Sequence, residues 1–92
     1  MRSREIPNDE QIKADLMNRL LRKHCWGAKY LPLITLINWI SKQVKDGKRI
    51  QRVVKQLVNE GYLMLHKGGA TVSLNPTRSK EIIEFVERVV KS

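Results

Sequence analysis

Apolar residues recur at helical spacing in two segments of the first half of the chain, and each segment predicts an amphipathic helix. The first helix follows the polar residues 1–8, extends to about residue 23 and has Asn8 or Asp9 as its expected cap. The second begins near Pro32, because the first turn of a helix accepts proline, and Asp46-Gly47 breaks its pattern. The apolar positions are Ile12, Leu16, Met17, Leu20 and Leu21 in the first helix, and Leu33, Leu36, Ile37, Ile40 and Val44 in the second.

A third helix is predicted over about residues 48–59, with one apolar and one strongly basic face. Its apolar residues are Ile50, Val53, Val54, Leu57 and Val58. The opposite side carries Lys48, Arg52, Lys55, Gln56 and Asn59, with Arg49 and Gln51 on the flanks. No acidic residue stands between Gly47 and Glu60. A solvated helix face usually mixes both signs of charge, so this one-sided face indicates a polyanionic partner.

Residues 62–74 predict a β-hairpin that turns at Gly68-Gly69, since a two-residue Gly-Gly loop adopts the positive φ angles that such turns need. The turn places Lys67 opposite Ala70 and Leu63 opposite Leu74. In this register one face carries Leu63, Leu65, Val72 and Leu74, and the other carries Met64, His66, Thr71 and Ser73. A different register would mix these two sets of residues, which supports this one.

The hairpin is followed by a last predicted helix, over about residues 76–91, with Asn75 as its cap and Pro76 in its first turn. Its apolar residues are Ile82, Ile83, Phe85, Val86, Val89 and Val90, and its surface pairs are Glu84→Arg88 and Glu87→Lys91. With a short extended piece at Tyr30-Leu31, the chain predicts a mainly α fold with a two- or three-stranded antiparallel sheet. We expect one domain over residues 9–92 after a flexible segment, residues 1–8.

Positive charge is concentrated in the middle of the chain. Residues 42–80 carry nine Lys and Arg against two Asp and Glu, which accounts for +7 of the formal net charge of +9. A basic surplus confined to one segment, in a chain whose sequence pI is about 10.1, is typical of nucleic-acid-binding domains.

The cysteine content and the distribution of apolar residues indicate the cellular compartment. The single cysteine, Cys25, excludes an intrachain disulfide framework and is typical of a reducing compartment. The first residues have no apolar stretch behind their arginines, as a secretory signal would, and no run approaches the roughly 20 apolar residues of a membrane helix. We therefore expect a cytoplasmic protein.

No pattern in the chain predicts catalysis, a metal site or a cofactor. His24, Cys25 and His66 match no zinc spacing, and Gly68-Gly69 lacks the flanking residues of a phosphate-binding loop. We expect Trp26 to pack at the edge of the core, whereas Trp39 lies off the apolar stripe of its helix and is expected to be exposed or at an interface. The expected activity is binding without chemistry, and no small-molecule substrate is evident.

The predicted order of elements resembles that of winged helix-turn-helix domains. The resemblance covers about residues 9–92 and is carried by Ile50, Val53-Val54, Leu57, Glu60-Gly61-Tyr62-Leu63 and Val72-Ser73-Leu74-Asn75-Pro76. The stretches around Cys25-Trp26-Gly27 and Leu65-His66-Lys67 are similar to those of small archaeal winged-helix proteins of unassigned role. In such domains the third helix usually enters the major groove of DNA, and the hairpin, or wing, touches the neighbouring backbone or minor groove.

The resemblance implies a set of nucleic-acid-binding residues. They are Lys42, Lys45, Lys48, Arg49, Arg52, Lys55, Gln56 and Asn59, with Lys67 at the tip of the wing. Arginine can read guanine, glutamine and asparagine can read adenine, and lysine mostly neutralises phosphate. Residues 42–47 form a longer and more basic turn than is usual before the recognition helix, so we expect that helix to be presented at an unusual angle.

These observations predict a DNA-binding protein, either a small transcriptional regulator or a chromatin-associated factor. Two alternatives are a winged-helix interaction module in a larger complex and an RNA- or ribosome-associated factor. The first and last helices carry more apolar surface than one core contact uses, which predicts a homodimer on paired half-sites of DNA. The alternative is that these two helices cover each other within one chain.

Overall fold

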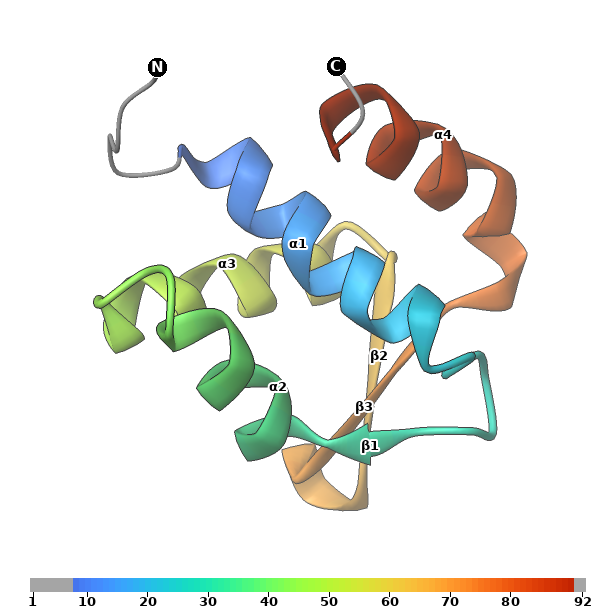
Figure 1. Ribbon diagram of the computed structural model, residues 1–92. Helices are drawn as coiled ribbons and strands as arrows, with labels where there is room; N and C mark the ends of the chain where they lie inside the picture. Colours follow the sequence, from blue (N-terminus) through green and yellow to red (C-terminus); the bar gives the residue numbers. More distant parts are fainter. Residues whose placement is uncertain (1–7, 91–92) are drawn as a thin grey trace.

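The computed structural model describes residues 8–90. They form four α-helices and a small three-stranded antiparallel sheet, in the mainly α arrangement that the sequence predicts (Figure 1). The elements are α1 (Asp9–Arg22), β1 (Leu31–Pro32), α2 (Leu33–Ser41), α3 (Gly47–Asn59), β2 (Leu63–His66), η1 (Lys67–Gly69), β3 (Thr71–Leu74), η2 (Pro76–Arg78) and α4 (Ser79–Val90). Residues 1–7 of the predicted flexible segment, and Lys91 of the predicted last helix, lie outside the described residues.

Two of the α-helices, α1 and α3, begin at side-chain caps. The Asn8 side chain accepts a hydrogen bond of 2.9 Å from the Gln11 amide, so residue 8 caps α1. Asp46 caps α3 in the same way, by accepting from the Arg49 amide at 3.1 Å. Asn75 accepts from the Thr77 amide at 3.1 Å, but the turn it starts is the 3-10 helix η2, and α4 begins only at Ser79.

The second helix is shorter than predicted. It ends at Ser41, and Pro32 lies in β1 immediately before it. The Ile40 carbonyl accepts from the amides of both Gln43 and Val44, at 2.9 and 3.0 Å, which closes the helix in a turn. Val44, which follows this turn, nevertheless belongs to the hydrophobic core.

The predicted hairpin register is confirmed. Leu63 pairs with Leu74 and His66 with Thr71, and β1 joins the other edge of β3, which gives the sheet order β1-β3-β2. Gly68 and Gly69 have φ angles of 68° and 95°, and the Ala70 amide donates to the Lys67 carbonyl at 3.3 Å. Lys67 also has a positive φ, 53°, so regular pairing ends one residue earlier, at His66.

Side chains on both faces of β3 are buried. The sequence analysis had expected only the face with Val72 and Leu74 to lie against the core. Ser73, on the predicted polar face, is fully buried because the segment after α1 covers it. The Ser73 hydroxyl donates to the Gly27 carbonyl at 2.9 Å. His66 Nε2 lies 2.9 Å from the Ser73 hydroxyl oxygen. Because that hydroxyl already donates its proton to Gly27, His66 Nε2 must be the donor in this second hydrogen bond. Residues 25–27 thus seal the central strand.

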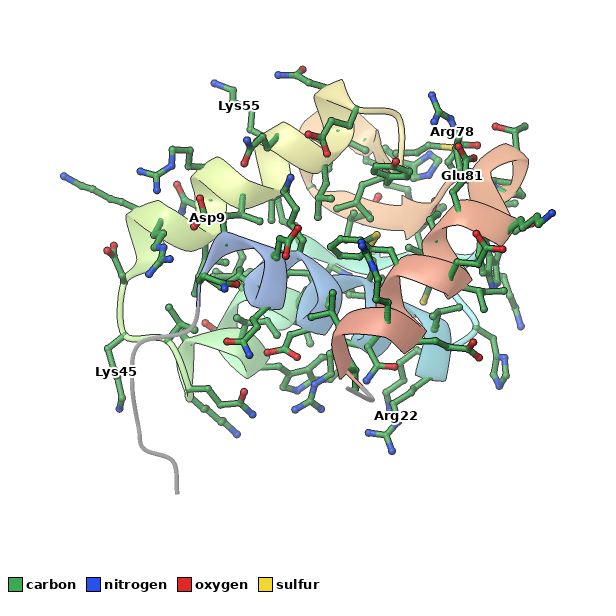
Figure 2. The ribbon with its side chains drawn as sticks, turned by 90° about the horizontal axis from the view of Figure 1, so that it is seen from above. Asp9, Arg22, Lys45, Lys55, Arg78 and Glu81 are labelled. Atoms are coloured by element: carbon green, nitrogen blue, oxygen red, sulfur yellow. The ribbon has the colours of Figure 1, made fainter. Side chains whose placement is uncertain are left out.

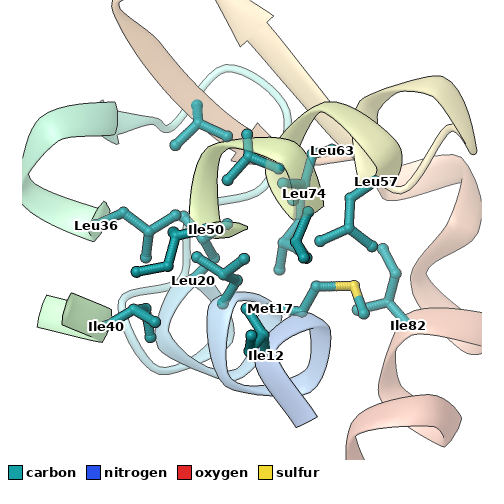
Figure 3. Packing of buried hydrophobic residues seen from close by; sticks show 14 of the residues in the cluster. Ile12, Met17, Leu20, Leu36, Ile40, Ile50, Leu57, Leu63, Leu74 and Ile82 are labelled. Carbon is teal, nitrogen blue, oxygen red and sulfur yellow. The ribbon is translucent and has the colours of Figure 1, made fainter. Parts of the chain in front are cut away.

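The core lies between α1 and the other elements (Figure 3). Met17 and Leu20 of α1 meet Leu36 of α2, Leu57 of α3 and Ile82 of α4. Helices α1 and α4 also pack directly on each other, which is the alternative to pairing them between two copies of the chain (Figure 1). The hairpin projects at the end of the molecule away from α4, beside the start of α2 (Figure 1).

Candidate nucleic-acid interface

The outer face of α3 is the most coherent group of predicted site residues. Its apolar face is buried in the core, which turns the opposite face to solvent. Lys48, Arg52, Lys55, Gln56 and Asn59 are all exposed. Figure 2 shows Lys55 pointing away from α1 and α4, whereas Arg22 projects from the opposite side of the molecule. The lysines and arginine of this face have no carboxylate partner among residues 8–90.

Arg49 is not part of this face. Its Nε lies 2.9 Å from Asp9 Oδ1, and only 22% of its side chain is exposed. At about 100° per residue, Arg49 stands on the flank of α3 that meets α1. Arg49 therefore joins the starts of two helices, and the structure does not bring it together with the exposed cations of the outer face.

A second ion pair lies farther along the same flank of α3. Lys13 Nζ of α1 is 3.3 Å from Glu60 Oε2, at the end of α3. The α1 side of the helix is thus neutralised at both ends. The positive potential of α3 is left on its outer face.

Lys42 and Lys45 extend the basic surface beyond the start of α3. Both are exposed in the turn between α2 and α3, and Figure 2 shows Lys45 projecting from this turn. They lie beside the N-terminal end of α3, where the helix dipole also favours an anion. Phosphate contact by these two lysines stays a prediction.

The tip of the hairpin combines a lysine with an aromatic pair. Lys67 is exposed, and its Nζ lies 5.4 Å from the centre of the Tyr30 ring. Tyr30 stacks on His66, with ring centres 5.0 Å apart and planes inclined by 30°. Tyr30 was not predicted as a site residue, although its place beside β1 and the hairpin register put it next to the tip.

A groove runs between α2, α3 and β2, and we call it the α2–α3–β2 groove. Its volume is about 510 Å³, and its lining residues are Leu33, Ile37, Lys48, Gln51, Arg52, Val54, Lys55 and Leu65. The sequence analysis did not predict this groove, because it assigned the apolar stripe of α2 and the apolar face of the hairpin to the core. Leu65 is instead 40% exposed, at the strand end that leaves the core.

The two tryptophans are both partly buried against the core, as predicted for Trp26. Trp39 is not simply exposed. The Arg19 guanidinium and the Lys23 ammonium of α1 lie 5.6 and 5.5 Å from the centre of its ring. Trp39 therefore joins α1 to α2 at the surface.

Cys25 is a core side chain. It is buried, and its thiol donates to the Lys23 carbonyl at 3.7 Å. Burial raises the pKa of the Cys25 thiol, against a smaller lowering by Lys29 and Lys23, so the neutral form is favoured. No cluster of three or more His, Cys, Asp or Glu side chains suited to a metal ion occurs within residues 8–90. Over the same range, every helix is too short or too polar to cross a membrane.

Comparisons of the chain with protein families, curated proteins and solved structures give no match. The functional proposal therefore depends on the geometry and charge of the chain itself.

Proposed function

We propose that the protein is a winged helix-turn-helix DNA-binding protein that acts as a small transcriptional regulator or chromatin-associated factor. Two features of the fold support the class. The chain order α1-β1-α2-α3-β2-β3-α4 and the sheet order β1-β3-β2 are those expected of a winged helix with an added C-terminal helix. In this proposal α3 is the recognition helix and the β2–β3 hairpin is the wing.

The observation that carries the proposal is the contrast between the two sides of α3. Toward α1, Arg49 and Glu60 are neutralised by ion pairs. The outer face has cations and amides but no carboxylate partner among the described residues. A face of this kind attracts phosphate and releases counterions when it binds.

The side chains divide into two roles. Lys48, Lys55 and the wing-tip Lys67 neutralise phosphate, which fixes the position of the helix but reads no sequence. Arg52 and the amides of Gln56 and Asn59 can form paired hydrogen bonds with guanine and adenine edges, respectively. Specificity would then reside in the middle and the C-terminal half of α3.

A salt titration tests the proposal. Binding of wild type to labelled duplex DNA, single-stranded DNA and structured RNA is measured by fluorescence anisotropy over a range of salt concentrations. We expect the duplex to bind most tightly, with an affinity that falls steeply as salt rises. A preference for structured RNA would support the RNA-associated alternative and overturn the proposal.

Substitutions then locate the surface. Arg52→Ala should weaken duplex binding by about 1–3 kcal/mol if Arg52 reads a base. Arg22→Ala is the matched control, because it removes the same charge from an exposed position on the opposite side of the molecule (Figure 2). Equal losses from the two variants would show that net charge, not the α3 face, governs binding.

A further inference from the structure

The floor of the α2–α3–β2 groove is an apolar surface that DNA contact does not use. This floor consists of the apolar lining residues, which are Leu33 and Ile37 of α2, the buried Val54 of α3 and Leu65 of β2. Leu65 is 40% exposed, although Leu63 and Val72 on the same face of the hairpin are buried. Exposed apolar surface bounded by polar residues is typical of an interaction site.

The rim of this groove has one sign of charge. Lys48, Arg52 and Lys55 of α3 line it, together with Gln51, and no acidic residue does. A DNA backbone would satisfy this rim and leave the apolar floor uncovered. An amphipathic helix with acidic flanks would cover both, because its apolar stripe would contact the floor and its carboxylates the rim.

We propose that the α2–α3–β2 groove docks an acidic amphipathic helix of a partner protein. The groove is open to solvent along one side and has no convergent buried polar group, which suits a helix face better than a small molecule. Because Lys48, Arg52 and Lys55 also belong to the proposed DNA surface, the docked helix and duplex DNA exclude each other. This competition depends on the proposed function, whereas the docking itself does not.

The test uses a synthetic peptide as the probe. It is about 18 residues long, sufficient for a helix of several turns, with leucines at helical spacing along one stripe and glutamates on the flanks. A second peptide has the same composition in shuffled order, which removes the stripe and keeps the charge. We expect wild type to bind the striped peptide at least about tenfold more tightly than the shuffled one, the change that one well-buried apolar contact supplies.

Two matched variants locate the site. Leu65→Thr removes apolar surface from the floor and introduces a β-branched side chain, a type that strands favour. Ile34→Thr is the control, because Ile34 is 63% exposed on α2 but does not line the groove. Leu65→Thr should weaken striped-peptide binding about tenfold and leave duplex binding unchanged, and Ile34→Thr should change neither.

Lys55→Glu tests the rim without changing the floor, and we expect the variant to fold because Lys55 is exposed on α3. This variant should bind both the striped peptide and duplex DNA more weakly than wild type does. Unlabelled duplex should displace the striped peptide from wild type. If duplex fails to bind at all while the peptide depends on Leu65, the DNA proposal is wrong and the docking site stands.

Three results would overturn the docking proposal. One is equal binding of the striped and shuffled peptides, which would mean charge attraction alone. Another is striped-peptide binding that Leu65→Thr leaves unchanged. The third is self-association of wild type that Leu65→Thr abolishes, which would assign the groove to a second copy of the chain.

Discussion

Arg49 and Asp9 are joined by a contact of 2.9 Å that fixes the start of α3 against the start of α1. Arg49 stands only three residues from Arg52, yet the two side chains face different surroundings. Arg49 is held in an ion pair between two helices, and Arg52 is exposed on the outer face. The two arginines should therefore differ in what they do.

Arg49→Ala should lower the free energy of unfolding by up to about 1 kcal/mol, the usual contribution of a partly exposed ion pair. It should leave duplex affinity close to that of wild type. Arg52→Ala should show the reverse, with stability preserved and affinity reduced. Urea unfolding and anisotropy measure the two quantities, and a large loss of affinity in Arg49→Ala would mean that Arg49 leaves Asp9 when DNA binds.

The contrast between these arginines shows what helical periodicity can predict. It correctly placed Ile50, Val53 and Leu57 in the core, because an apolar stripe has one direction that buries it. It could not distinguish the two flanks of the polar arc. Which flank α1 covers depends on how the helices cross, and that is decided by contacts between residues some 40 positions apart.

The hairpin shows the same division between local and distant information. Its register followed from alternation and from Gly68-Gly69, both of which are local. The cover over Ser73 comes from Gly27, 46 residues earlier in the chain, in a segment without periodicity. The α2–α3–β2 groove was not predicted for the same reason. Alternation assigns Leu65 to the apolar face of the hairpin, but it cannot show that Leu65 is left partly exposed in a groove beside α2 and α3.

Asp15 gives a prediction for the dependence of stability on pH. Burial raises its pKa from the ordinary 3.8, and Arg19 opposes this with a smaller lowering. A raised pKa means that the folded state binds the proton more tightly than the unfolded state does, so Asp15 lowers stability as the pH rises through and above 3.8.

Asp15→Asn should therefore raise the free energy of unfolding at neutral pH, with a gain that shrinks as the pH falls toward 3.8. Urea unfolding of wild type and variant over this range measures the gain. Glu84→Gln is the control, since Glu84 is exposed on α4. A gain that is independent of pH would show that ionisation of Asp15 is not its cause.

A substitution of Lys67, at the tip of the hairpin, should affect DNA binding without lowering stability. Its φ of 53° is unfavourable for a residue with a Cβ, and glycine removes that cost. Lys67→Gly should therefore keep or raise stability, while the loss of one phosphate contact reduces the slope of log K against log salt by about 0.9. An unchanged slope would mean that the tip does not touch the backbone of DNA.

Gly68 tests the turn itself. A Cβ at this position meets no atom within 4 Å, so any cost of substitution comes from its φ of 68° and not from a clash. Gly68→Val should destabilise the protein by about 1–2 kcal/mol or more, because β-branched residues tolerate this region poorly. Thermal unfolding measures the loss, and a variant as stable as wild type would exclude the tight turn.

The last prediction concerns the association state. The structure leaves less apolar surface for a dimer contact than the sequence analysis expected. Helices α1 and α4 cover each other within the chain, so the apolar surface left on α4 is mainly Ile83 and Val90, which are 40% and 43% exposed. Two such side chains are far less than the roughly 800 Å² per partner of a stable interface. We therefore expect a monomer in free solution and a homodimer that forms on paired DNA half-sites, where the duplex raises the local concentration.

Sedimentation at micromolar concentration, with and without a duplex carrying two half-sites, measures this state. Ile83→Glu should prevent the second copy from binding cooperatively, because it places a charge in the expected contact. Ile34→Glu, which changes an equally apolar and more exposed side chain on α2, should not. A clean 10.7 kDa monomer in solution together with non-cooperative, single-copy binding to the paired site would rule out the dimer.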